Sequence, residues 1–342
     1  MLQTVQEPRR AEPPATFRET CLAACRFMLL ARVLDDKLAA LYRAGKIHGG
    51  VFLGRGQEAL SVSIGLSLKK CDVFAPLIRD AAGRLAFGEP LIDAVRTYLG
   101  SSLGPMRGRD GNVHRGRPRE GYLPMVSHLG AMISVVNGML LARKLKKISG
   151  TVGAASIGDG ATSTGAFHEA LNQAAIEKLP LVLVIANNQY AYSTPTSRQF
   201  ACRDLADKAI GYGVESQSVD GTDLAACLET VGGAVARARE GRGPQMVVAT
   251  LLRLCGHGEH DDAGYVDPKL KASPVGRDCL KVAEEFLIRQ KWMDAAQLAA
   301  LRDRLVRDVE EAVAQAQREP APDPFVENWC AISTEHLNEG HE

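Results

Sequence analysis

The chain has 342 residues, of which 46% are hydrophobic and 24% charged, and its formal net charge is +1. This content suffices for a large folded core, and the near-neutral charge excludes a bulk electrostatic attraction to nucleic acid or to a membrane surface. No apolar run reaches the roughly 18 to 20 residues that a membrane-spanning helix needs. From the charge and the apolar runs together, we expect neither nucleic acid nor a membrane among its partners.

The chain begins with MLQTVQEPRRAEPPA, which is polar and rich in proline and has no apolar signal core. We expect a flexible arm at residues 1–16 and a separate tail at residues 326–342. Two glutamates accompany the arginine pair of the arm, so a mitochondrial transit segment is the weaker interpretation. The eight cysteines form no CxxC pair, which favours reduced, packed thiols in a cytoplasmic protein.

A capping box opens the first predicted helix, because Thr16 is followed three positions later by Glu19. We expect this helix to end at Gly45. Residues 101–124 are rich in Gly, Arg and Pro and predict a long loop, a kind of segment that is usually functional in a compact domain. Around this loop the sequence predicts a short strand at residues 71–77 and helices at residues 56–68, 90–99 and 130–147.

The second half of the chain alternates strands with helices, and this alternation predicts an α/β fold with a doubly wound parallel sheet flanked by helices. No Pro/Gly/Ser-rich linker divides the middle, so we expect one domain at residues 17–325. Apolar runs predict strands at residues 151–157, 181–186, 213–219 and 245–252. Amphipathic patterns predict a helix between the first two of these strands and others at residues 222–239, 274–290 and 294–317.

Two short polar motifs follow neighbouring predicted strands. Gly158, Asp159 and Gly160 follow the predicted strand at 151–157. The pair Asn187-Asn188 follows the next predicted strand, at 181–186. A strand–helix–strand unit brings both loops to the carboxyl edge of a parallel sheet, where such sheets bind ligands. Magnesium takes few oxygens from protein and the rest from phosphate and water. The two glycines leave room for a diphosphate, and the following helix points its N-terminus at the anion.

These motifs resemble the signature of thiamine-diphosphate enzymes. The wording GDGATSTGAFHEALNQA resembles the alpha subunit of the decarboxylating component of 2-oxo acid dehydrogenase complexes, and NNQYAYSTPTSRQ is especially close to the branched-chain type. The resemblance covers residues 17–325. It implies that Asp159, Asn188 and the carbonyl of Tyr190 bind magnesium, and that the backbone N–H groups of Gly160 and Ala161 face the diphosphate. Taken singly, a helix-capping Asp and a turn Asn would be the simpler interpretation.

The resemblance also implies further cofactor contacts. Arg79, in LIRDA, corresponds to an arginine that binds a diphosphate oxygen, although Ile78 stands where the family usually has a tyrosine. In SHLG, Ser127 and Leu129 correspond to residues beside the aminopyrimidine ring. A surface arginine and a helix-start serine are the alternatives for Arg79 and Ser127.

Two histidines are the candidate catalytic residues. His257, in RLCGH, matches the family's active-site histidine, which can bond the diphosphate and stabilise charge on a reacting intermediate. The alternative is a loop histidine in solvent. His114, in GRDGNVHRG, matches a histidine near the active-site mouth, and a role in loop structure is equally open.

The resemblance implies half of an active site. The glutamate that activates the cofactor belongs to a second domain in this family, carried by a beta subunit, and this chain is too short to contain that domain. We therefore expect an α2β2 heterotetramer that decarboxylates a 2-oxo acid, either branched-chain or pyruvate, and passes the acyl group to a lipoyl-bearing acyltransferase. The alternatives are an acetoin dehydrogenase alpha subunit, a half-transketolase-type subunit and a non-catalytic scaffold subunit.

Overall fold

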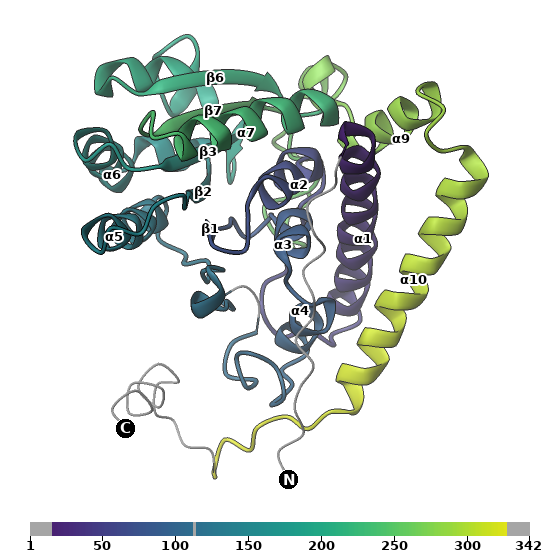
Figure 1. Ribbon diagram of the computed structural model, residues 1–342. Helices are drawn as coiled ribbons and strands as arrows, with labels where there is room; N and C mark the ends of the chain where they lie inside the picture. The colour runs from purple at the N-terminus through teal and green to yellow at the C-terminus, as the bar shows by residue number, and fades with distance from the viewer. Residues whose placement is uncertain (1–15, 112–113, 327–342) are drawn as a thin grey trace.

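Five parallel strands form the central sheet in the order β1-β2-β3-β7-β6 (Figure 1). The computed structural model of the chain describes residues 16–111 and 114–326. The predicted α/β fold with its parallel sheet is confirmed. The strands are β1 (Val73–Ala75), β2 (Gly153–Gly158), β3 (Leu181–Asn187), β6 (Glu215–Asp220) and β7 (Gln245–Thr250).

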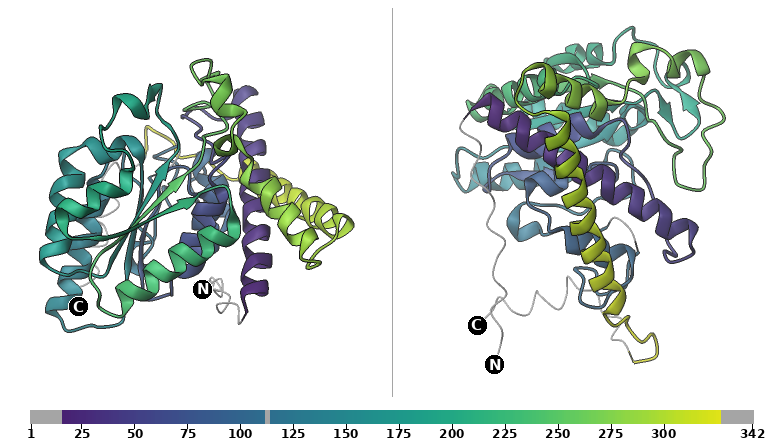
Figure 2. Two further views of the ribbon diagram at one scale, coloured as in Figure 1. Left: turned by 90° about the horizontal axis from the view of Figure 1, so that it is seen from above. Right: turned by 90° about the vertical axis from the view of Figure 1, so that its right-hand side faces the viewer.

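Helices cover both faces of this sheet, as the left view of Figure 2 shows. A parallel sheet covered on both faces needs strands that are apolar throughout, and residues 181–185 of β3 are fully buried. Strand β6 lies at the edge and is mostly polar. One face carries α5 (Ala131–Leu145), α6 (Gly165–Ile176) and the 3-10 helix η4 (Leu205–Tyr212), and the other carries α2 (Glu58–Ser67) and α7 (Leu224–Arg239).

The direction of winding changes between β3 and β7. Helix α6 connects β2 to β3, whereas α7 connects β6 back to β7 in the opposite direction. Because both crossovers are expected to be right-handed, the two helices lie on opposite faces. The loops that follow β3 and β7 therefore part at the carboxyl edge, the place where open α/β sheets hold their ligands.

A helical layer lies beside the sheet, and the long α10 crosses α1 and packs against α1 and α4 (Figures 1 and 2). The predicted capping box is present, with Thr16 Oγ1 accepting from the Glu19 backbone N–H at 3.2 Å. The layer consists of α1 (Phe17–Arg43), α3 (Ala81–Phe87), α4 (Leu91–Tyr98), α9 (Cys279–Arg289) and α10 (Ala295–Arg318). The shorter elements are η1 (Pro118–Glu120), η2 (Asp159–Ser163), β4 (Tyr190–Ala191), β5 (Thr194–Pro195), η3 (Thr196–Arg198), α8 (Pro268–Lys271) and η5 (Pro274–Gly276).

One predicted helix is divided in the structure. The stretch 274–290 forms η5 and then α9, because Arg277 takes an extended conformation and Asp278 caps α9 by accepting from the Leu280 N–H at 3.1 Å. The sequence also missed α3 and the hairpin β4–β5. The expected arm at 1–16 and tail at 326–342 lie outside the described residues except for one residue each. Within the described ranges, no helix is long and apolar enough to cross a bilayer.

Candidate active site

Asp159 and Asn188 lie side by side at the carboxyl edge of the sheet. Strands β2 and β3 pair in parallel up to Gly158 and Ala186, so the two polar residues follow adjacent strand ends. Their side chains are almost fully buried, with exposures of 1% for Asp159 and 6% for Asn188. Two polar side chains that sequence reasoning paired across the strand–helix–strand unit are therefore neighbours in the fold.

The three predicted metal ligands converge. The amide oxygen of Asn188 lies 3.0 Å from the Tyr190 carbonyl oxygen and 3.3 Å from Asp159 Oδ1, so it faces only other oxygens. Either the amide turns and donates to both, or a cation lies among the three. Octahedral magnesium, with oxygens at 2.0–2.1 Å, places neighbouring ligands about 2.9 Å apart, so the donor set fits magnesium. The described residues contain no cluster of three or more His, Cys, Asp and Glu side chains that could hold another metal.

Neighbouring side chains hold these ligands in place. Gln199 Nε2 donates to Asp159 Oδ2 at 2.7 Å, and Arg253 Nη1 donates to the Tyr190 carbonyl at 3.2 Å. Asn188 Nδ2 lies 3.5 Å from Gln57 Oε1. Burial raises the pKa of Asp159, although the bond from Gln199 opposes the shift. A cation at the carboxylate would offset that cost of burial.

The two glycines of the GDG motif have different local surroundings. A Cβ atom on Gly160 would lie 2.5 Å from the Cβ of Ala191 in β4, so the hairpin requires glycine there. A Cβ atom on Gly158 would meet no atom of the chain within 4 Å. Gly158 thus faces the open side predicted for a ligand, whereas Gly160 is explained by packing. Ala161, which follows, is buried within η2.

Two buried arginines make the site electropositive. Arg79 Nη1 donates to the Leu53 carbonyl at 2.8 Å, and its Nη2 donates to the His257 carbonyl at 2.5 Å. Arg253 donates to the carbonyls of Tyr190 and Tyr192. Burial lowers the pKa of Arg79 to about 10, and Arg253 adds to the shift. Buried cations whose donors meet neutral carbonyls are suited to an anionic ligand.

His257 lies on the loop after β7, within contact of Arg79. Burial, together with the positive charges of Arg79 and Arg253, lowers its pKa to about 4. Its backbone N–H donates to Asp261 Oδ2 at 2.5 Å, and this bond orders the loop around the histidine. The ring packs against Phe52 and Tyr192, with centroid distances of 5.4 Å and 4.5 Å. The histidine is thus neutral near pH 7, and its ring is held between Phe52 and Tyr192.

A second group of predicted residues gathers before α5. His114 Nε2 lies 3.3 Å from Ser127 Oγ, and His114 Nδ1 lies 2.6 Å from Asp110 Oδ2. Leu129 is 54% exposed, and its carbonyl accepts from Thr164 Oγ1 at 3.4 Å. Since Thr164 caps α6 directly after η2, this group adjoins the GDG loop.

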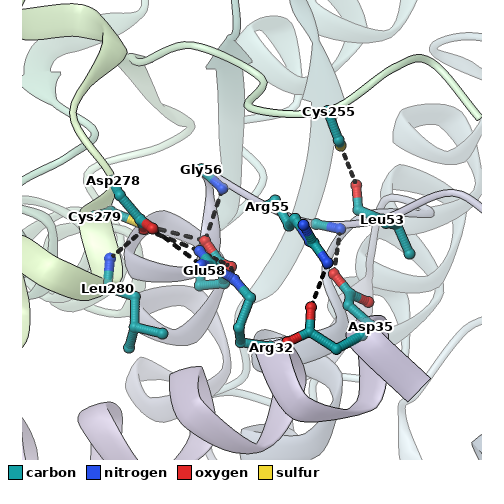
Figure 3. A network of polar contacts seen from close by, with 12 residues as sticks. Arg32, Asp35, Leu53, Arg55, Gly56, Glu58, Cys255, Asp278, Cys279 and Leu280 are labelled. Carbon is teal, nitrogen blue, oxygen red and sulfur yellow. Dashed lines mark hydrogen bonds and ion pairs between the residues drawn. The ribbon is translucent and has the colours of Figure 1, made fainter. Parts of the chain in front are cut away.

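A polar network fixes the turn that carries Leu53 and Gly56 (Figure 3), directly before Gln57. Buried Glu58 accepts from Arg32 at 2.6 Å, from the Gly56 N–H at 2.9 Å and from Cys279 Sγ at 3.1 Å. The network ties α1, α2 and α9 to the segment that contacts Arg79 and Asn188. Such support of the contacting residues is what keeps a binding site in one geometry.

Sequence reasoning assigned no role to four residues of this region: Gln57, Asp110, Gln199 and Arg253. Gln57 is only 1% exposed, and its Nε2 has no hydrogen-bond partner in the described chain. A polar residue after Gly56, at the start of a buried helix, was its only signal. Arg253 follows β7 at the carboxyl edge, and that position was its signal.

Comparisons with known proteins agree with this arrangement. The family described as "Dehydrogenase E1 component" matches residues 25–325. The alpha subunit of acetoin:2,6-dichlorophenolindophenol oxidoreductase from Cupriavidus necator is 32% identical, over 90% of this chain and 92% of its own length. The 2-oxoisovalerate dehydrogenase alpha subunit of Bacillus subtilis is 30% identical, over 87% and 91%. The pyruvate dehydrogenase E1 alpha subunit of Rhizobium meliloti is 30% identical, over 90% and 88%.

Proposed function

The chain belongs to the dehydrogenase E1 component family, and from this we propose that it is the alpha subunit of a thiamine-diphosphate-dependent 2-oxo acid dehydrogenase. It is an oxidoreductase that acts with a beta subunit. The oxidative decarboxylation of a 2-oxo acid, branched-chain or pyruvate, is its reaction. In the second half of the proposed reaction, the acyl group passes to a lipoyl arm of an acyltransferase.

One observation carries this function most strongly: three oxygens suited to magnesium lie at the same sheet edge as two buried arginines. Asp159, Asn188 and Tyr190 would hold the metal, and Arg79 would bind the diphosphate. When bound, thiamine diphosphate supplies a nucleophilic carbon and an electron sink for the loss of carbon dioxide. The residues proposed to bind it are Arg79, Ser127, Leu129, Gly158, Asp159, Gly160, Ala161, Asn188 and His257.

The two histidines have separate proposed roles. His257 is neutral near pH 7, so it can donate a hydrogen bond to developing negative charge while Arg79 supplies the positive field. His114, on the loop before η1, acts at the mouth of the site beside Ser127. Both act only on what is bound between this chain and its partner.

An exposed apolar surface supports the beta subunit as partner. Leu129 and Val135, at the start of α5, are 54% and 45% exposed, and Val126 before them is also exposed. Large apolar side chains gathered at one place on a surface are typical of an interface. We propose an α2β2 assembly in the cytoplasm, in which residues 17–325 form one domain and the beta subunit supplies the cofactor-activating glutamate.

Acetoin is the second candidate substrate, because one relative carries acetoin in its name. A steady-state assay of the alpha–beta complex on pyruvate, 3-methyl-2-oxobutanoate and acetoin decides between them. We expect turnover of a 2-oxo acid. A preference for acetoin would instead identify the chain as the alpha subunit of an acetoin dehydrogenase. No turnover by the alpha chain alone is also expected, and robust activity without the beta subunit would contradict the half-site.

A further inference from the structure

Asp110, His114 and Ser127 form a linear chain of hydrogen bonds. Asp110 Oδ2 lies 2.6 Å from His114 Nδ1, and His114 Nε2 lies 3.3 Å from Ser127 Oγ. The aspartate and the histidine belong to the loop before η1, whereas the serine lies four residues before the start of α5. The long loop thus contributes two residues to the group beside Leu129.

The chemistry of the three groups gives this chain a direction. An ionised carboxylate only accepts hydrogen bonds, so a neutral His114 must carry its proton on Nδ1. The Nε2 atom then has a free lone pair and accepts the hydroxyl proton of Ser127. The remaining lone pairs of Ser127 Oγ are left to accept a hydrogen bond from outside the chain.

We propose that Asp110 is a positioning residue that fixes the His114 tautomer, so that Ser127 presents its oxygen as an acceptor to an N–H group of the bound ligand. The ligand part of this inference rests on the proposed function. The exocyclic amino group of the aminopyrimidine is an N–H donor of the required kind. Without Asp110 the imidazole is free to turn, and Ser127 can then present its O–H instead.

The location supports this role. Ser127 lies two residues before Leu129, whose carbonyl accepts from Thr164 at the start of α6. Thr164 directly follows η2, which begins with Asp159. The acceptor therefore lies on a segment that is hydrogen-bonded to the start of α6, next to the proposed metal and diphosphate contacts.

The first experiment needs no cofactor. The full chain is labelled with ring-¹⁵N histidine, and the His114 signals are assigned with His114→Gln. We expect a protonated Nδ1 and an unprotonated Nε2 in the wild type, a mixture of tautomers in Asp110→Ala, and restoration in Asp110→Glu. Asp308→Asn, an exposed position on α10, should leave the spectrum unchanged. A wild-type His114 that carries a proton on Nε2 would overturn the proposal.

The second experiment tests the ligand. Calorimetry on the alpha–beta complex compares thiamine diphosphate with its analogue that lacks the exocyclic amino group. Asp110→Ala should weaken the binding of the natural cofactor by about 3- to 10-fold, the worth of one neutral hydrogen bond, and leave the analogue unaffected. An equal loss for both ligands would contradict the acceptor role of Ser127. If the wild type bound neither ligand, the proposed function would fail, and the tautomer would still decide the role of Asp110.

Discussion

Arg79 Nη2 donates a hydrogen bond to the carbonyl oxygen of His257 at 2.5 Å, across 178 residues of sequence. The bond joins the loop after β1 to the loop after β7, on either side of the strands that directly precede Asp159 and Asn188. It also places a buried guanidinium against the histidine whose pKa it lowers. The same contact thus orders the loop and sets the charge of the site.

Replacing Arg79 with alanine should weaken the binding of thiamine diphosphate to the alpha–beta complex. A hydrogen bond to a charged group is worth about 1.5–3 kcal/mol, so we expect a loss of roughly 10- to 150-fold by calorimetry. Arg79→Lys should recover part of it, since lysine keeps the charge without the planar fork. The exposed Arg304→Ala serves as control. Equal affinities for wild type and Arg79→Ala would remove Arg79 from the site.

The lowered pKa of His257 predicts a pH dependence of stability. Between its usual value of 6.5 and the folded value of about 4, the folded protein binds fewer protons at this residue than the unfolded chain. Stability should therefore fall as the pH drops from about 6.5 to about 4. His257→Gln should flatten this part of the curve in thermal unfolding. Parallel curves for the two proteins would show that His257 does not carry the effect.

Gly158 and Gly160 form a matched pair of alanine substitutions. Gly160→Ala introduces a Cβ 2.5 Å from that of Ala191 and should destabilise the protein by about 1–3 kcal/mol. Gly158→Ala meets nothing within 4 Å and should fold normally while weakening cofactor binding. Chemical denaturation and calorimetry separate the two effects. In the double variant Gly160→Ala with Ala191→Gly, stability should return, and persistent instability would rule out this clash as the cause.

Gln57 should influence metal binding through Asn188. Its Oε1 lies 3.5 Å from Asn188 Nδ2, and it favours the orientation in which the Asn188 oxygen faces Asp159 and Tyr190. Gln57→Met, which has a similar shape but no amide, should raise the magnesium concentration needed for cofactor binding by about 2- to 10-fold. A magnesium titration at fixed thiamine diphosphate measures this. An unchanged midpoint in a folded Gln57→Met protein would exclude the coupling.

Local patterns predicted the fold and the positions of Asp159 and Asn188 at the sheet edge. The apolar runs before GDG and NN are contiguous in sequence, so the strands and the positions of Asp159 and Asn188 at their ends follow from short segments. The sequence also predicted the long helix α1, because Thr16 and Glu19 are three residues apart.

Contacts between distant segments were not predictable in the same way. Gln57 meets Asn188 across 131 residues, and Arg253 meets Tyr190 across 63. The local signals of Gln57 and Arg253 do not identify the residue that each contacts, since that depends on which loops the sheet order brings together. The division of the stretch 274–290 was missed for a related reason, since Asp278 can cap a new helix as readily as it can continue an old one.

The binding of thiamine diphosphate and magnesium is the central claim, and Asp159→Ala tests it most directly. The alpha–beta complex of the wild type and of this variant is titrated with both ligands by calorimetry, with Asp308→Asn as control and thermal unfolding as a check that each protein is folded. We predict binding by the wild type and the control and none by Asp159→Ala. Unchanged binding by a folded Asp159→Ala protein would contradict the account.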